Sequence, residues 1–107
     1  MFIIELTYVV PLPQIDAAMK RHMAYLDRRY ADGTFVMSGR KVPRDGGIIL
    51  ATGDDRAAIE AIAADDPFVA EGLATARIIE FRPSQLAPDL PARLAVAGSQ
   101  RRGGRAP

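Results

Sequence analysis

Apolar residues fill the beginning of the chain almost without a break, from position 2 to position 10. Most of them are β-branched or aromatic, which is typical of a strand buried in a sheet. Pro11 and Pro13 end this strand, because proline has no amide hydrogen to donate to a neighbouring strand and restricts the residue before it.

The spacing of apolar residues changes after these prolines and becomes three to four positions between residues 14 and 31. This period predicts an amphipathic helix that turns one stripe of side chains toward a core. Gly33 follows the stripe and suits the left-handed position that often ends a helix. The stripe consists of Ile15, Ala18, Met19, His22, Tyr25, Leu26 and Tyr30.

Two short apolar segments, residues 34–38 and 48–52, predict two further strands. The segment between them is polar and glycine-rich with no helical pattern, so we expect an antiparallel hairpin with a long loop. A second helix is predicted up to residue 64, with an aspartate at 54 or 55 as its N-cap. A short turn follows, and the alternating segment 73–81 predicts the fourth strand.

The predicted order is therefore β-α-β-β-α-β, the order of a ferredoxin-like α+β fold. In that fold a four-stranded antiparallel sheet carries both helices on one face. The other face is left bare, and no further helix is predicted in residues 1–87 to cover it. We expect a second copy of the chain to pack there, which makes a homodimer.

The chain has 107 residues, enough for one domain, which we place at residues 1–87. This part is slightly acidic, with ten Lys/Arg and twelve Asp/Glu, which speaks against binding of nucleic acid. Residues 88–107 are rich in Pro, Ala, Gly and Arg and carry a net charge of +3. We expect a flexible basic tail with a short helix over residues 91–97 and disorder in the last ten residues.

The chain has no cysteine, and no apolar run in it reaches the eighteen residues that a membrane span needs. Its apolar beginning contains Glu5 and has no basic residues before it, unlike a signal peptide. These features predict a cytoplasmic protein that does not enter a membrane. One histidine and no cysteine leave too few ligands for a transition-metal site, so neither a metal nor another cofactor is expected.

His22, the only histidine, lies on the apolar stripe of the first helix. An imidazole at the edge of a cleft could act as a general acid or base, but a histidine on such a stripe is also typical of a protein core. Asp65 and Asp66 offer a carboxylate to orient it, although Asp66 followed by Pro67 is also a usual helix start. The residues alone leave both alternatives open.

The polar segment 38–47 contains three basic side chains, Arg40, Lys41 and Arg44, among flexible glycines. Such a segment could hold a carboxylate or another anion, and it could equally be a solvated hairpin loop. Its spacing matches neither a phosphate-binding loop nor a dinucleotide fingerprint.

Several short motifs together resemble the YciI-like (YCII-related) family over residues 1–83. The first is His-x-x-Tyr-Leu, which begins at His22. The others are the segments 33–39, 43–50, 66–68, 72–74 and 80–83. The resemblance implies a ferredoxin-like fold whose sheets pair into a dimeric α+β barrel.

The resemblance also implies a His–Asp pair, which falls on His22 and Asp66, with Ser38 and Arg44 near the cleft. Asp65 has no counterpart, and Arg40 stands where many members have proline. One branch is similar to enzymes that eliminate chloride from chlorinated aromatic diols. We therefore expect a small cofactor-independent enzyme that performs acid–base chemistry, elimination or isomerisation, on a small anionic or aromatic metabolite. The alternative is a non-catalytic module of the same dimeric fold that binds a small molecule or a protein.

Overall fold

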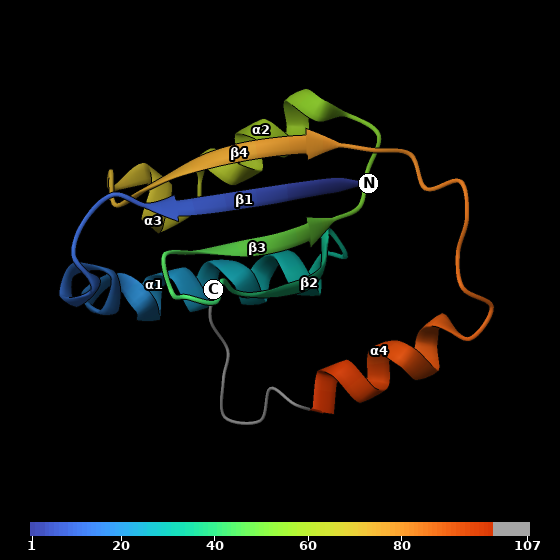
Figure 1. Cartoon of the computed structure of the whole chain (residues 1–107). Coiled ribbons are helices and arrows are strands. Elements are labelled where there is room, and N and C mark those ends of the chain that lie inside the picture. The colour runs from blue at the N-terminus through green and yellow to red at the C-terminus, as the bar shows by residue number, and fades with distance from the viewer. Residues whose placement is uncertain (100–107) are drawn as a thin grey trace.

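A computed structural model describes residues 1–99 and shows a four-stranded antiparallel sheet (Figure 1). The strands are β1 (Phe2–Tyr8), β2 (Phe35–Arg40), β3 (Gly46–Ala51) and β4 (Ala74–Glu80), in the spatial order β2-β3-β1-β4. Ile4 in the central strand β1 lies opposite Ile49 in β3 and Ile78 in β4. The predicted order of strands and helices along the chain, β-α-β-β-α-β, and the ferredoxin-like fold are confirmed.

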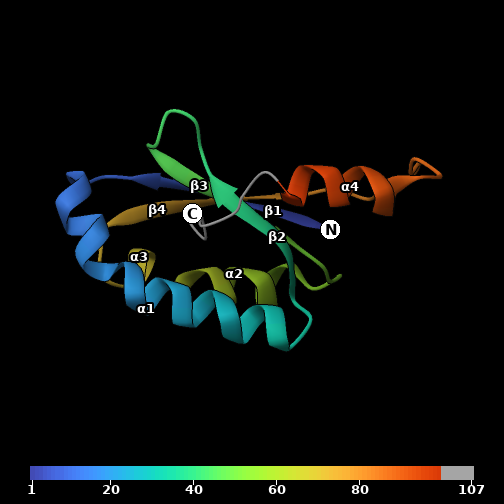
Figure 2. The same ribbon diagram turned by 90° about the horizontal axis from the view of Figure 1, so that it is seen from below.

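Helices α1 (Leu12–Ala31) and α2 (Arg56–Ala64) cover one face of the sheet, together with the single-turn helix α3 (Pro67–Ala70) (Figure 2). Strand residues two positions apart share a face, and on the face of β1 toward these helices Phe2, Ile4 and Leu6 are fully buried and Tyr8 is half-buried. The core between sheet and helices contains Phe2, Ile4, Leu6, Ile15, Ala18, Tyr25, Leu26, Phe35, Ile49, Ala51, Ile59, Ala63, Phe68 and Ala74.

The opposite face of the sheet has an apolar part and a charged part. One row across the four strands joins Met37, Leu50, Ile3 and Ile79, which are all apolar and partly or well exposed. The next row joins Gly39, Ile48, Glu5 and Arg77, and Lys41 pairs with Glu5 at 3.1 Å. The first strand is therefore buried on one face rather than on both.

The hairpin differs from its prediction in the length of its loop. We expected residues 39–47 to form a polar connection, but β2 continues to Arg40 and β3 begins at Gly46. A glycine is required at Gly46 for a steric reason: a Cβ there would lie 1.8 Å from the Leu6 carbonyl oxygen. Gly39 and Arg40 are thus held on an edge strand, next to Ser38, instead of in a flexible loop.

Two aspartates cap helices as the sequence predicted. The Asp55 side chain accepts a hydrogen bond from the Ala58 amide at the start of α2, and Asp66 accepts one from the Phe68 amide at the start of α3. Helix α1 begins at Leu12 and includes Pro13, because a proline in the first turn lacks only an amide that has no partner inside the helix.

The C-terminal helix α4 (Leu90–Ser99) is longer than the predicted segment 91–97 and lies apart from the sheet (Figure 1). The division into a domain of residues 1–87 and a flexible basic tail stays a prediction, and most of the last ten residues, 100–107, lie outside the described part. Within residues 1–99 no helix is long and apolar enough to cross a membrane.

Candidate active site

His22 and Asp66 form a buried hydrogen-bonded pair between α1 and α3. His22 Nδ1 and Asp66 Oδ1 are 2.9 Å apart, and the two residues expose 0% and 1% of their surface. A carboxylate accepts hydrogen bonds, so Nδ1 carries the hydrogen and Nε2 has a free lone pair in the neutral ring. The pairing of these distant positions agrees with the expected His–Asp pair.

One carboxylate oxygen of Asp66 accepts two hydrogen bonds that stabilise the fold. Besides the bond from His22, Oδ1 accepts the Phe68 amide hydrogen at 2.9 Å, which is the N-cap bond of α3. The two alternatives considered for Asp66, a helix cap and an imidazole partner, are therefore compatible, because a carboxylate oxygen accepts more than one hydrogen bond.

Phe68 closes one side of the imidazole. Its ring stacks on His22 with a centroid distance of 4.0 Å and an angle of 7°, and the Tyr8 ring meets Phe68 edge-on at 5.8 Å. Tyr25 stacks on the histidine at 6.4 Å. The pair thus lies in an aromatic, low-dielectric environment, where hydrogen bonds and charge interactions are stronger than in water.

Four buried polar atoms in this region have no hydrogen-bond partner among the described residues: His22 Nε2, Asp66 Oδ2, the Tyr8 hydroxyl and Arg44 Nε. Such atoms are uncommon in native proteins, since each costs about 1–3 kcal/mol when it loses water without gaining a partner. Their concentration around Phe68 marks this end of the molecule as the candidate site.

Arg44 reaches this region from the hairpin loop. One of its terminal nitrogens, Nη2, binds Asp16 Oδ1 in the second turn of α1 at 2.6 Å, and the guanidinium lies beside the Tyr8 hydroxyl. Burial raises the pKa of the Tyr8 phenol, and Arg44 offsets part of the rise. The hydroxyl is therefore protonated at neutral pH and able to donate a hydrogen bond.

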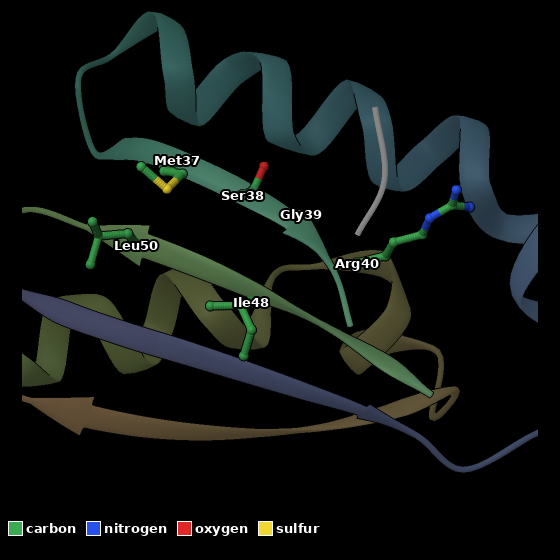
Figure 3. Close-up of a pocket in the computed structure, with 6 residues that line it drawn as sticks. All are labelled: Met37, Ser38, Gly39, Arg40, Ile48 and Leu50. Carbon is green, nitrogen blue, oxygen red and sulfur yellow. The ribbon is translucent and has the colours of Figure 1, made fainter. Parts of the chain in front are cut away.

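Ser38 lies at a different part of the molecule. Its hydroxyl bonds to the Tyr30 hydroxyl at 2.5 Å, and Tyr30 follows His22 by eight residues in α1, or about 12 Å along the helix axis. In Figure 3 the Ser38 side chain points from β2 toward α1. Among residues 1–99 no hydrogen bond joins Ser38 to His22 or Asp66.

A hollow of about 250 Å³ lies at this edge of the sheet (Figure 3). It is lined by Met37, Ser38, Gly39, Arg40, Ile48 and Leu50. Most of these side chains are apolar and belong to β2 and β3, so the hollow adjoins the open face of the sheet rather than the His–Asp pair. Arg40, which departs from the family pattern, adds a cation at this edge.

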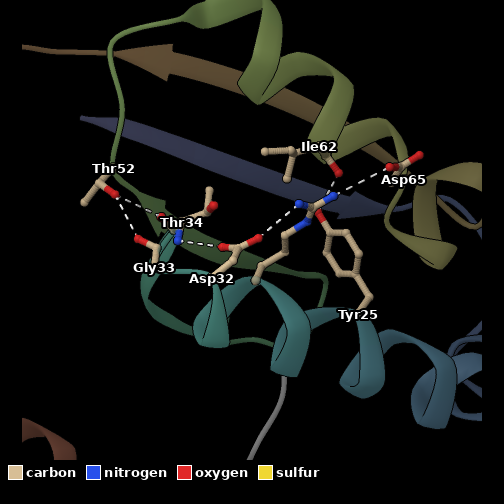
Figure 4. A network of polar contacts seen from close by, with 8 residues as sticks. Tyr25, Asp32, Gly33, Thr34, Thr52, Ile62 and Asp65 are labelled. Carbon is tan, nitrogen blue, oxygen red and sulfur yellow. Dashed lines mark hydrogen bonds and ion pairs between the residues drawn. The ribbon is translucent and has the colours of Figure 1, made fainter.

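A polar network connects the C-terminal half of α1 with the end of α2 and with Thr34 and Thr52 beside the strands (Figure 4). The Tyr25 hydroxyl donates to the Ile62 carbonyl oxygen at 2.6 Å, and Arg29 pairs with Asp32 at 3.1 Å and with Asp65 at 3.7 Å. The Asp65 side chain is 72% exposed, so the two adjacent aspartates point in opposite directions. This arrangement agrees with leaving Asp65 out of the expected site.

Tyr8 and Asp16 are the parts of this region that sequence reasoning missed. Tyr8 stood in a continuous apolar strand, and its only signal was a hydroxyl among hydrocarbon side chains. Asp16 lay on the polar side of a helix, where an acidic residue needs no special explanation. Within residues 1–99 no group of three or more His, Cys, Asp or Glu side chains could hold a metal ion.

Among solved structures, the chain is similar to 5-chloro-2-hydroxyhydroquinone dehydrochlorinase (TftG) from Burkholderia phenoliruptrix in complex with 2,5-dihydroxybenzoquinone. The TM-score is 0.64 at 16% identity, over 77% of this chain and 94% of that chain. A mutant of SnoaB, a cofactor-independent oxygenase from Streptomyces nogalater, gives a TM-score of 0.46 at 18% identity, over 81% of this chain and 94% of that chain. No curated protein sequence matches the chain at a significant level.

The likeness to the dehydrochlorinase concerns the fold alone and agrees with the ferredoxin-like α+β arrangement of the sheet and helices. The sequence itself matches the family model of the YCII-related domain over residues 1–82, which is most of the chain. The chain therefore belongs to the YCII-related domain family.

Proposed function

We propose that the protein is a small cofactor-independent enzyme that uses the His22–Asp66 pair for acid–base chemistry on a small anionic or aromatic molecule. The observation that carries the proposal is the 2.9 Å bond between His22 Nδ1 and Asp66 Oδ1, combined with a partnerless Nε2 on the same ring. A histidine oriented in this way has one nitrogen committed to the fold and one available for a proton.

Asp66 would hold the imidazole in one tautomer and stabilise the imidazolium that forms when Nε2 accepts a proton. In an elimination, Nε2 takes a proton from the substrate, the electrons of the broken bond form a new double bond, and the leaving group departs with its own electron pair. In an isomerisation, Nε2 returns the proton to another atom of the substrate. Arg44 would hold an anionic group of the substrate during either reaction.

The position of Ser38 gives less support for a role in binding the same substrate. Its hydroxyl is bonded to Tyr30, two turns of α1 beyond His22, so it would contact only the far end of a ligand that reaches Nε2. We retain it in the proposal in that role alone.

A homodimer is part of the proposal. The apolar row of Met37, Leu50, Ile3 and Ile79 on the open face is the surface that a second copy would cover. Met37→Lys, in this row, would place a charge in the interface and yield monomers in analytical ultracentrifugation. Val42→Lys, in the hairpin loop, is the matched control and would leave the dimer intact. A monomeric wild type would contradict the proposed homodimer.

A cytoplasmic location, inferred from the sequence, also belongs to the proposal.

The full burial of His22 favours the alternative, a non-catalytic module in which the pair stabilises the fold. The imidazole exposes none of its surface and is stacked on Phe68, as a core histidine would be. A substrate can reach Nε2 only if a side chain around the ring moves. The alternative therefore predicts ligand binding without turnover, or no binding near His22 at all.

The test is a panel of small phenols, quinones and carboxylates, with 2,5-dihydroxybenzoquinone as one member, measured by thermal stabilisation and by turnover. His22→Asn is the sharpest variant, since its amide can still donate to Asp66 while Nε2 is removed. Arg21→Gln, on the exposed side of the same helix, is the control. Turnover that is lost in His22→Asn but kept in Arg21→Gln supports the enzyme. Ligands that bind the wild type without turnover support the binding module.

A further inference from the structure

The unpartnered atoms around Phe68 include two donors, and both come from residues at the end of β1 and in the hairpin loop. The Tyr8 hydroxyl and Arg44 Nε are buried, and neither makes a hydrogen bond of good geometry with the described residues, although the guanidinium and the hydroxyl lie close enough to affect each other's pKa. A protonated phenol and a guanidinium both donate hydrogen bonds, and the guanidinium cannot accept one. The phenol oxygen can accept a hydrogen bond from the neighbouring guanidinium, but the phenol hydrogen still needs an acceptor, and so does any guanidinium hydrogen that the phenol and Asp16 leave unused.

The backbone holds these two donors next to each other. The Tyr8 amide donates to the Asp45 carbonyl oxygen at 2.9 Å, which ties the end of β1 to the residue after Arg44. Asp16 binds the Arg44 Nη2 at 2.6 Å and thereby orients the guanidinium. Asp16 also offsets part of the arginine charge, but it leaves the Nε hydrogen unused.

The same two donors lie close to the His–Asp pair. The Tyr8 ring meets Phe68 edge-on at 5.8 Å, and Phe68 stacks on His22 at 4.0 Å. Phe68 therefore contacts both the Tyr8 ring and the His22 ring, and Asp66 is near enough to Tyr8 to contribute to the raised pKa of its phenol. The Arg44 side chain is 26% exposed, so this end of the site also extends to the surface.

We propose that Tyr8 and Arg44 form a subsite for an ionised oxygen, such as a carboxylate or an enolate, of the substrate that His22 acts on. The inference rests on the proposed function and adds to it a second substrate-binding residue, Tyr8, and the kind of atom, an ionised oxygen, that Tyr8 and Arg44 would bind together. Hydrogen bonds from a guanidinium and a hydroxyl to a charged oxygen are among the stronger ones in proteins. The subsite would orient the substrate, while the proton transfer stays with His22.

Tyr8→Phe is the decisive variant because it keeps the aromatic ring against Phe68 and removes only the hydroxyl. Removal of a buried hydroxyl that has no partner should leave the unfolding midpoint unchanged or raise it. Tyr25→Phe is the matched control: its hydroxyl donates to the Ile62 carbonyl oxygen, so its loss should lower the midpoint. A purely structural Tyr8 would behave like Tyr25.

The binding probes are benzoate and acetate, with benzamide as the uncharged counterpart of benzoate, titrated by calorimetry. We expect the wild type to bind at least one of the two anions more tightly than benzamide. Tyr8→Phe and Arg44→Gln should each weaken that anion about tenfold or more, and Tyr25→Phe should not. If neither anion binds the wild type, or if Tyr8→Phe binds the anion as the wild type does, the proposal is wrong.

The outcome separates this inference from the proposed enzyme. If anion binding depends on Tyr8 and Arg44 but the protein turns over no member of the panel, the subsite is supported and the proposed catalysis is wrong. If turnover depends on His22 but is unchanged in Tyr8→Phe, the proposed catalysis is supported and the subsite is wrong.

Discussion

Replacement of Asp66 by alanine removes two hydrogen bonds that end on one buried oxygen. The first is the N-cap bond from the Phe68 amide, and such bonds contribute about 1 kcal/mol. The second is the bond from His22 Nδ1, and its loss leaves a buried donor without a partner, which costs about 1–3 kcal/mol. We expect Asp66→Ala to lower the free energy of unfolding by about 2–4 kcal/mol.

Asp55→Ala is the matched control, because Asp55 caps α2 with a single, solvent-exposed bond of 3.3 Å to the Ala58 amide. This variant should lose about 1 kcal/mol or less. At roughly 4 °C per kcal/mol for a domain of this size, Asp66→Ala should melt about 8–16 °C below the wild type. Urea unfolding followed by circular dichroism measures both variants, at one protein concentration because association would shift the result.

A double variant isolates the contribution of the imidazole. His22→Phe in the Asp66→Ala background removes the orphaned donor and keeps a ring against Phe68, so it should restore part of the lost stability. If Asp66→Ala lowers the free energy of unfolding no more than Asp55→Ala does, the buried His22–Asp66 pair does not hold the two helices together, and the predicted stabilisation is wrong.

Three further predictions concern the scaffold. Gly46→Ala should destabilise the protein by more than 2 kcal/mol, because a Cβ there meets a β1 carbonyl oxygen, whereas Gly39→Ala, with open space around it, should be nearly neutral; equal effects in urea unfolding would contradict this. Hydrogen bonds from Thr34 hold the pKa of Asp32 below its ordinary value, so the stability that the carboxylate adds is present at neutral pH and is lost as the pH falls through the lowered pKa. The wild type should therefore exceed Asp32→Asn in urea unfolding at pH 7 and lose this advantage in strong acid; a difference that is independent of pH would refute it. Tyr25→Phe should cost about 1 kcal/mol in the same assay, since it leaves the Ile62 carbonyl oxygen without its partner; an unchanged stability would show that water replaces the bond.

The elements of the fold could be read from the sequence because they depend on neighbouring residues. The apolar period of two or of three to four positions follows from the geometry of one strand or one helix. The caps at Asp55 and Asp66 likewise need only the next few amides. The hairpin was the exception, because the close approach of Gly46 to Leu6 in another strand is invisible in a local pattern.

The candidate site could be predicted only in part. The sequence placed His22 on the core stripe of α1, and the family resemblance added Asp66, but the pattern alone did not decide which of two adjacent aspartates faces the ring. The structure turns Asp66 inward and Asp65 toward Arg29, since the direction of each side chain depends on how α1, α2 and α3 dock.

By itself, then, the sequence determined the order of strands and helices, the helix caps and the stripe that buries His22. Only the tertiary structure brought Tyr8, Asp16 and Arg44 from three separate segments to the vicinity of that histidine. It also separated Ser38 from His22 by two turns of helix. The physical reason is that local periodicity sets which face a residue takes on its own element. Sheet register and helix docking, which are long-range, decide which faces meet.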